Sequence, residues 1–224
     1  MDGTIQNKPT ETQFGNYQAL FDYFNEKLFA GSLPEIILNF SRKTNAAGFF
    51  APDRWSSQDG KIKTHEISIN PSYMGTVTFE RLCSTLVHEQ AHLWQQTFGK
   101  PTRNGYHNKE WGDKMESIGL MPSDTGEEGG KRTGQRVTHY ILENGQFKHA
   151  FANMPKKISL PWVAAVEGIP RKRTGKKKKT SKIKYTCPGC GMNVWGKPGL
   201  KVYCKPCETY LESEEPEDDS QDDD

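Results

Sequence analysis

Two residue patterns in this sequence have the types and spacing that bind metal ions. The first, His88-Glu89-Gln90-Ala91-His92, is an H-E-x-x-H motif. On a helix, residues i and i+4 are offset by about 40°, so both imidazoles project from one face about one turn apart. This spacing suits a tetrahedral zinc ion, with Glu89 in reach of a water that the metal activates. The alternative is a polar helix face with two histidines and an ordinary surface glutamate.

A catalytic zinc site needs a third protein ligand and an open fourth position for water. His107 follows the motif across a loop, at the start of a second predicted helix, from which it can return to the metal. Glu110 and Glu116 are competing candidates, and either would make a site of two histidines and one glutamate. We expect the other histidines on the surface of strands or a hairpin: His65, His139 and His149.

The second pattern consists of two Cys-x-x-Cys pairs, Cys187/Cys190 and Cys204/Cys207, with thirteen residues between them. Two such pairs facing each other across a hairpin form a closed four-thiolate zinc site, a zinc ribbon. We expect this zinc to be structural, because a segment of under about thirty residues cannot bury enough core to fold alone. The sequence therefore predicts two zinc ions per chain, one catalytic and one structural. Redox chemistry is the alternative for either pair.

The H-E-x-x-H motif lies in a predicted helix over Phe79–Phe98. Thr78 is a suitable N-cap, and Gly99 followed by Pro101 ends the helix. At 100° per residue the helix has two apolar stripes, so we expect it to be packed on two sides, as a central helix would be. One stripe contains Val87, Ala91, Trp94 and Phe98, and the other contains Leu82, Leu86 and Leu93.

The remaining pattern predicts an α+β domain around this helix. Helical spacing is found over residues 14–29 and 108–118, and strand-like stretches over 35–40, 47–51 and 66–70. Residues 52–63 are expected to form an exposed connection. Residues 137–142 and 146–151, joined by Asn144-Gly145, are expected to form a β-hairpin.

At 224 residues the chain has room for one ordinary domain and a small appendage. We expect a disordered N-terminus (1–13), the main domain (14–165), a basic linker (166–184), the zinc ribbon (185–211) and an acidic disordered tail (212–224). The sequence contains no apolar run that could span a membrane and no secretory signal, so we expect a cytoplasmic protein that does not bind membranes.

The predicted linker concentrates positive charge although the net charge of the chain is only +2. Residues 171–184 carry nine basic side chains and no acid, a density that suits phosphate neutralisation and hence DNA binding. The alternative is a solvated linker without a partner. The predicted nucleic-acid-binding residues are Arg171, Lys172, Arg173, Lys176, Lys177, Lys178, Lys179, Lys182 and Lys184.

The segment 85–94, together with Gly105-Tyr-His-Asn-Lys-Glu-Trp, resembles the SprT-like, Spartan-related zinc metalloproteases over about residues 14–165. In that family the helix supplies two histidines and the catalytic glutamate, and a third histidine follows in an H-x-x-E-aromatic block. The resemblance implies a zincin-like SprT domain with His88, His92 and His107 as zinc ligands and Glu89 as general base. A C-terminal zinc ribbon also occurs in many members. Residues 125–140 resemble a loop of bacterial members, expected near the site.

The resemblance implies a zinc metalloendopeptidase that hydrolyses peptide bonds of DNA-associated proteins, including proteins crosslinked to DNA. Tyr140 and Arg136 are candidate oxyanion donors. One alternative is a non-catalytic zinc-containing scaffold that binds DNA or protein in transcription or repair. Glu89 argues against it, since a scaffold needs no base beside two zinc ligands. A small-molecule zinc hydrolase would leave the basic run and the ribbon without a purpose.

Overall fold

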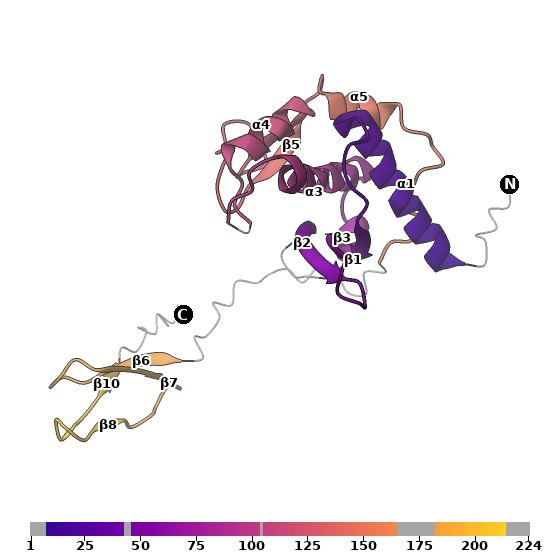
Figure 1. The fold of residues 1–224 in the computed structure, drawn as a ribbon. Coiled ribbons are helices and arrows are strands. Elements are labelled where there is room, and N and C mark those ends of the chain that lie inside the picture. Colours follow the sequence, from indigo (N-terminus) through magenta and orange to yellow (C-terminus); the bar gives the residue numbers. More distant parts are fainter. Residues whose placement is uncertain (1–7, 43–45, 104, 165–181, 214–224) are drawn as a thin grey trace, which may run out of the picture. The chain divides into compact units, whose positions relative to one another are not determined.

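The computed structural model describes residues 8–42, 46–103, 105–164 and 182–213. The chain divides into two compact units, Met1–Glu167 and Gly168–Asp224. The first is a mixed helix-and-sheet unit, and the second is a small β unit (Figure 1). Within the described residues, no helix has the combined length and apolarity needed to cross a membrane.

The first unit is built on a three-stranded sheet of order β1-β3-β2. Strand β1 (Ile37–Phe40) is parallel to β3 (Lys63–Ile69), and β2 (Gly48–Ser56) is antiparallel to it. Ile67 and Ile69 point from β3 into the hydrophobic core. Helices α1 (Pro9–Phe29) and α3 (Phe79–Phe98) pack against each other and against this sheet (Figure 1). The core therefore lies between the sheet and these two helices.

Helix α3 has the bounds predicted from the sequence. The Thr78 hydroxyl accepts a hydrogen bond from the Arg81 amide, as an N-cap does. Both predicted apolar stripes are used, because residues from each are buried, although Phe98 at the end of one stripe is 54% exposed. The helix is packed on more than one side, which confirms its central position.

The N-terminal boundary of the first unit differs from the prediction. We expected residues 1–13 to be disordered, but α1 begins at Pro9, whose fixed φ suits the first turn of a helix. Gln13 is buried and exchanges two hydrogen bonds with the backbone of Trp162, at 2.9 and 3.0 Å. These bonds tie the first turns of α1 to a segment almost 150 residues away. Residues 1–7 lie outside the described part of the chain.

Strand β2 is longer than predicted. Pro52–Ser56, expected within an exposed connection, continue the strand after a register shift between Ala51 and Trp55. Asp53 lies in this shift with a left-handed backbone (φ 48°). The side chains from Pro52 to Ser56 are exposed, so the expected exposure is correct although the backbone is paired.

The predicted hairpin of residues 137–151 is wrong. Strand β5 (Thr138–Ile141) pairs instead with β4 (Leu120–Ser123), which the sequence pattern did not reveal, and Gln146–Ala152 form helix α5. Phe147 is fully buried and stacks on Phe24 of α1, with ring centroids 5.5 Å apart. Phe147 and Phe151 are four residues apart, so the helix presents both rings on the same side.

Two short helices complete the first unit. Helix α2 (Pro71–Met74) follows the sheet and is capped by Asn70, whose side chain accepts a hydrogen bond from the Ser72 amide. Helix α4 (Lys109–Ser117) follows the loop after α3 and packs against both α3 and β4. The helix predicted over 108–118 is thereby confirmed.

The second unit contains a three-stranded antiparallel sheet of order β10-β6-β7 and a two-stranded ladder, β8 with β9. The strands are β6 (Ile183–Thr186), β7 (Asn193–Gly196), β8 (Tyr203–Cys204), β9 (Thr209–Tyr210) and β10 (Glu212–Ser213). The buried side chains of Ile183, Tyr185 and Leu211 form a small core with the cysteines.

Both predicted boundaries of the ribbon were too narrow. Ile183 and Lys184, assigned to the linker, belong to β6, because Ile183 is needed in the small core. Glu212 and Ser213, assigned to the disordered tail, pair with β6 as β10. Residues 166–181 of the predicted linker and residues 214–224 of the predicted tail lie outside the described residues.

The contact between the turn before α5 and the end of α4 gives a stability prediction. A Cβ on Gly145 would lie 2.7 Å from the Cα of Gly119. Backbone hydrogen bonds hold both glycines, because the Leu142 N–H donates to the Gly119 carbonyl and the Gly145 N–H donates to the Leu142 carbonyl. We expect Gly145→Ala to lower the free energy of unfolding by about 1–3 kcal/mol. Urea unfolding followed by circular dichroism of the helix band measures it, because all described helices lie in the first unit.

Gly15→Ala is the matched control. Gly15 lies inside α1, and nothing lies within 4 Å of the position that a Cβ would occupy there, so alanine should stabilise the helix by about 0.5–1 kcal/mol. Equal stability of the Gly145→Ala variant and the unmodified protein would contradict the close packing of the two turns.

Candidate metal centre

Three histidines, two from α3 and one from the loop that follows it, converge on one site. His88 and His92 project from the helix, and His107 lies just before α4. Their ring centroids are 4.8–5.4 Å apart, and one nitrogen atom from each ring lies within 4.8 Å of the others. Three imidazole nitrogens this close together can share one metal ion.

His107 reaches this position because the loop after α3 is tied back to the helix. Gln95, buried on α3, donates hydrogen bonds to Asn108 at 2.7 Å and to Glu110 at 2.8 Å. Glu110 also accepts the backbone N–H of Lys100 at 2.7 Å, and these bonds lower the pKa of its carboxyl. Asn108 caps α4 through the Trp111 amide.

Neither competing glutamate belongs to the cluster. Glu110 is engaged in the loop contacts just described, and Glu116 pairs with Arg132 at 2.5 Å. The group of potential ligands found in the first unit consists of His88, His92 and His107. The structure thus brings together the three histidines expected from the family resemblance.

The segment after β4 holds the other side of His107. The backbone N–H of His107 donates to the Gly134 carbonyl at 2.8 Å, and the Gly134 N–H donates to the His107 carbonyl at 3.0 Å. The ring Nδ1 of His107 lies 3.2 Å from the same Gly134 oxygen. A carbonyl only accepts, so Nδ1 carries the proton and Nε2 has the lone pair for a metal. The segment 125–140, whose last residues form the start of β5, therefore lies beside the site, as expected.

Trp111 forms a rigid wall against all three rings. It is fully buried and stacks on His92 with centroids 5.0 Å apart and an interplanar angle of 18°. It meets His88 and His107 edge to face at 4.8 and 4.4 Å. The indole limits the rotation of the imidazoles, which lowers the entropic cost of binding a metal.

His139 is not the surface residue that we expected. It is 2% exposed, on β5, and its Nδ1 lies 3.2 Å from Nδ1 of His88. Its Nε2 lies 2.9 Å from the hydroxyl of Ser84. The prediction failed because β5 pairs with β4 and faces α3, rather than forming a solvent-facing hairpin. His65 is half-buried on β3 and accepts the Asp53 amide, whereas His149 is exposed on α5.

Burial keeps these imidazoles neutral. It lowers the pKa of His92 and of His139 to about 3, with further lowering from His107 and from Arg81 respectively. It also lowers the pKa of His88 well below its usual value and that of His107 to a smaller extent. Neutral imidazoles have the free lone pair that metal binding requires.

Glu89 occupies the narrow space between α3 and β2. It is 6% exposed, and its Cγ would lie 3.4 Å from a Cβ placed on Gly48, at the start of β2. The same Cβ would lie 3.2 Å from Thr85 and 3.1 Å from the Ser68 carbonyl. Glycine at this position therefore lets β2, an edge strand of the sheet, run close beside the glutamate.

The donor set of the first unit fits a zinc ion of the catalytic type. Three neutral imidazoles are typical ligands of such sites, and a fourth position remains for water or substrate. Glu89 follows His88 directly in the sequence, which is the position of the glutamate in an H-E-x-x-H motif.

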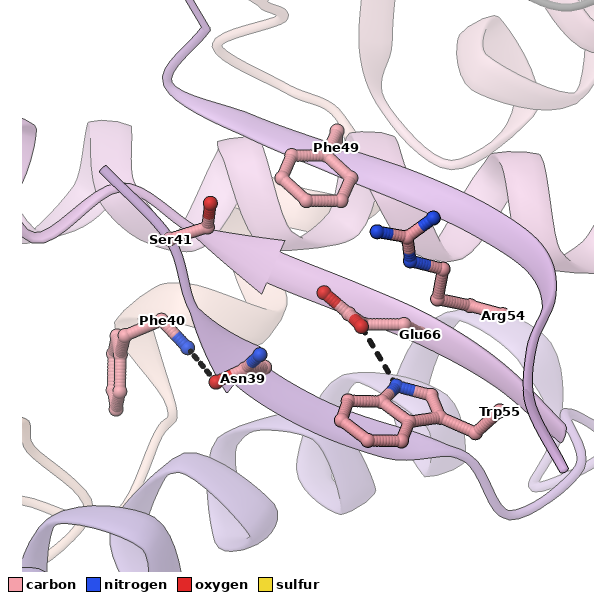
Figure 2. A pocket seen from close by; sticks show the side chains of 7 residues that line it. All are labelled: Asn39, Phe40, Ser41, Phe49, Arg54, Trp55 and Glu66. Carbon is pink, nitrogen blue, oxygen red and sulfur yellow. Dashed lines mark hydrogen bonds between the residues drawn. The ribbon is translucent and has the colours of Figure 1, made fainter. Parts of the chain in front are cut away.

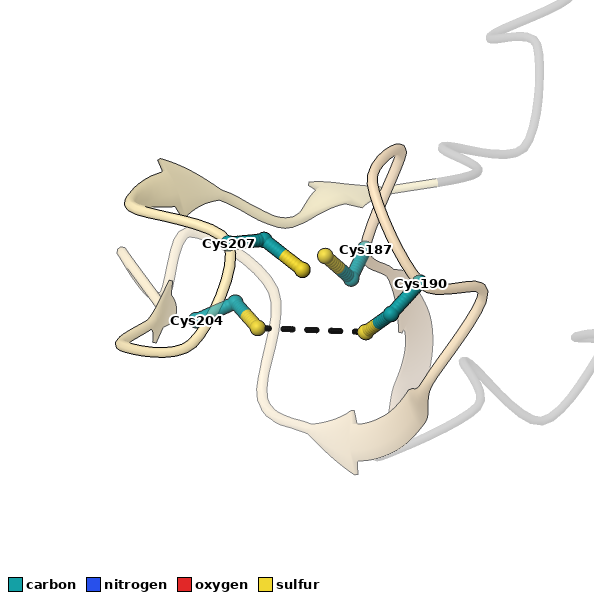
Figure 3. A group of neighbouring side chains, drawn as sticks. All are labelled: Cys187, Cys190, Cys204 and Cys207. Atoms are coloured by element: carbon teal, nitrogen blue, oxygen red, sulfur yellow. Dashed lines mark hydrogen bonds between the residues drawn. The ribbon is translucent and has the colours of Figure 1, made fainter.

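The second unit gathers its four cysteines as a separate donor set (Figure 3). All four sulfur atoms lie within 4.8 Å of one another. Hydrogen bonds from the Cys190 and Gly189 amides lower the pKa of Cys187 to about 7, whereas the neighbouring thiols of Cys190 and Cys204 raise the pKa of Cys207 to about 12. Four deprotonated thiols so close together would repel one another, and a bound divalent cation would relieve that repulsion. Four thiolates give the closed coordination of a structural zinc site.

A separate hollow of about 460 Å³ lies on the other face of the sheet (Figure 2). Glu66 alternates with the core residue Ile67 along β3, so its side chain points away from the helices. Glu66 is 4% exposed, and its carboxylate accepts hydrogen bonds from the Trp55 indole at 2.7 Å and the Ser68 hydroxyl at 2.5 Å. This hollow shares no residue with the histidine cluster.

The family model of the SprT-like family matches residues 17–138, which is more than half of the chain. The chain belongs to the SprT-like family. The match includes the three clustered histidines and Glu89, and it ends before the cysteine unit. SprT-like domains are generally zinc metallopeptidase-like. An "Uncharacterized protein in mucB 3'region" of Salmonella typhimurium is 30% identical over 61 residues, which are 27% of this chain and 82% of that protein.

The other residues predicted to belong to a site in this SprT-like protein are not part of the histidine cluster or lie outside the described residues. Tyr140 lies on the face of β5 opposite His139, so it does not face the histidines, and Arg136 is exposed. Lys184 lies on β6 opposite Trp195 of β7, and Lys182 is exposed. The other seven predicted nucleic-acid-binding residues, from Arg171 to Lys179, lie outside the described residues.

The two donor sets predict how metal binding responds to a ligand substitution. We expect two zinc ions per chain, and His107→Ala should lose the zinc of the first unit while retaining the zinc of the cysteine site. Metal analysis of protein dialysed against a weak chelator measures the ratio. His149→Ala, which removes an exposed histidine, should keep both ions. Retention of both by His107→Ala would exclude His107 as a ligand.

Proposed function

We propose that this protein is a zinc metalloendopeptidase with a zincin-like SprT domain and a C-terminal zinc ribbon. The observation that carries the proposal is the position of Glu89, which is buried on α3 directly after His88 of the three-histidine cluster and lies next to the edge strand β2. His88, His92 and His107 would hold the catalytic zinc. Cys187, Cys190, Cys204 and Cys207 would hold the structural one.

The edge strand supports a peptide substrate. An extended peptide can add to the edge of a sheet through main-chain hydrogen bonds, whatever its side chains. Because β2 begins beside Glu89, a peptide lying along it would bring one of its carbonyl groups to the histidine cluster. A small-molecule hydrolase would have no use for this edge.

The bound zinc would supply a Lewis acid that polarises the scissile carbonyl and acidifies water. Glu89 would accept the proton of the attacking water and later deliver it to the leaving amine, as general base and then general acid. The close approach of Gly48 to its Cγ restricts the side chain to the space between α3 and β2. The three imidazoles stay neutral, so Glu89 is the proton carrier.

DNA-associated proteins, including DNA-crosslinked ones, are the substrate class that we propose. The support is the basic run 171–184 together with the exposed aromatic rings of the second unit: Trp195, Tyr203 and Tyr210 are 50–62% exposed. Exposed rings flanked by lysines suit base stacking and phosphate binding. Attachment to DNA would raise the local concentration of bound protein substrates.

Glu89→Gln should remove proteolysis while leaving both zinc sites intact. We expect the rate to fall at least about 10²-fold, because glutamine cannot accept the proton. The assay follows cleavage of a DNA-binding protein with and without DNA, and Glu128→Gln, an exposed acid, is the matched control. Absence of cleavage by the unmodified protein with both zinc ions bound would favour the non-catalytic scaffold instead.

DNA binding through the basic run predicts a change in salt dependence. Converting Lys176, Lys177, Lys178 and Lys179 to glutamine leaves β6 untouched, whereas deleting residues 171–184 would remove part of it. The slope of log K against log salt concentration should become shallower by up to about 0.7–0.9 per lost phosphate contact. An unchanged slope in a fluorescence anisotropy titration would identify the run as a linker.

A further inference from the structure

We propose that His139 is a positioning residue that sets the tautomer of His88 and so directs Nε2 of His88 to the zinc. The inference rests on the proposed zinc site. His139 lies one residue beyond the part of the chain matched by the family model, and its sequence context gave no sign of this role. Three consecutive hydrogen bonds, which begin at a backbone carbonyl, determine where the protons lie.

The first bond joins the Ser84 hydroxyl to the Arg81 carbonyl at 2.9 Å. A carbonyl can only accept, and a hydroxyl has a single proton, so Ser84 donates that proton here. In its second contact, 2.9 Å from Nε2 of His139, the Ser84 oxygen must therefore accept. His139 is thus protonated on Nε2.

A neutral imidazole with its proton on Nε2 has a lone pair on Nδ1. Nδ1 of His139 lies 3.2 Å from Nδ1 of His88, so His88 must donate in this contact. The proton of His88 is then on Nδ1, and Nε2 has the lone pair for the metal. The backbone carbonyl of Arg81 thereby determines which nitrogen of His88 is the ligand.

The three side chains are closed off from solvent. Ser84 is 0% exposed, His139 2% and His88 9%, so water cannot easily replace a missing partner. Arg81 also holds the strand that carries His139. Its guanidinium donates to the His139 carbonyl at 2.9 Å and to the Thr138 hydroxyl at 3.0 Å. Arg81 therefore has two functions: its backbone carbonyl ends the hydrogen-bond chain, and its guanidinium anchors β5.

His107 is oriented in the same way by the Gly134 carbonyl. The segment 134–139 thus contributes two acceptors, one from the backbone and one from a side chain, to two different histidines. Partners of this kind typically change metal affinity by 10–100-fold when they are removed.

The test compares two substitutions in the full-length protein. His139→Phe keeps a ring but removes the acceptor, and we expect the affinity of the histidine site for cobalt(II) to fall 10–100-fold. His139→Asn places an amide oxygen near the position of Nδ1 and should restore most of that affinity. Thiolate-to-cobalt charge-transfer bands report the cysteine site separately, and they should not change. His149→Phe is the control.

The proposal would be overturned if the His139→Phe variant bound cobalt(II) as tightly as the unmodified protein does. It would also be overturned if His139→Phe and His139→Asn lost the same amount of cobalt(II) affinity. A second measurement needs no variant. Long-range ¹H–¹⁵N correlation spectra of the zinc-loaded protein should show His139 protonated on Nε2 and His88 on Nδ1. The reverse tautomer of His139 would overturn the proposal even if the variants do not fold.

These outcomes separate the proposal from the proposed function. A zinc-loaded protease with the reverse tautomer would exclude only the role of His139. A histidine site that binds neither zinc nor cobalt(II) would exclude both the peptidase and the positioning role.

Discussion

The structure of the first unit depends on one constraint: the central helix buries polar side chains that must find partners. Ser84, His88, Gln90 and Gln95 of α3 are all nearly or fully buried. A buried polar group without a hydrogen bond costs free energy of folding. The segments around α3 supply many of these bonds, although Oε1 of Gln90 is buried without a hydrogen-bond partner among the described residues. Gln90 donates to the Phe21 carbonyl of α1 at 2.9 Å, and Gln95 organises the loop that leads to α4.

The same bonds place the functional groups. Gln95 bonds to Glu110 in the following segment, which turns the chain back so that His107 approaches the helix. Ser84 and Arg81 bond to His139 and Thr138, which holds β5 against α3. Trp111 then fixes the three rings by contact on their faces and edges. Hydrogen bonds from the buried polar face of α3 therefore also assemble the three-histidine cluster.

The two donor sets differ in the way that their proposed roles require. Three neutral imidazoles from α3 and the following loop can leave one coordination position open, which catalysis needs. Four thiols in a unit with a core of a few side chains would close the coordination sphere, and the metal then contributes to folding. Each set lies within one unit, so neither depends on the arrangement of the two units.

The sequence predicted correctly those features that depend on residues close together in the chain. The bounds of α3 followed from Thr78, Gly99 and helical periodicity, and the positions of the four cysteines followed from two closely spaced pairs. His88 and His92 share a face because i and i+4 do so on any helix. The proximity of His107 was expected from spacing and from the family resemblance together.

Only the tertiary structure decided the features that depend on distant contacts. Residues 146–152 form a helix because Phe147 packs on α1, and Gln13 extends α1 by bonding to Trp162. The burial of His139 follows from the pairing of β5 with β4 and from the Arg81 contacts. These interactions join residues that are far apart in the chain, whereas periodicity and capping signals describe only near neighbours. The acceptor that orients His88 was therefore visible only in the folded protein.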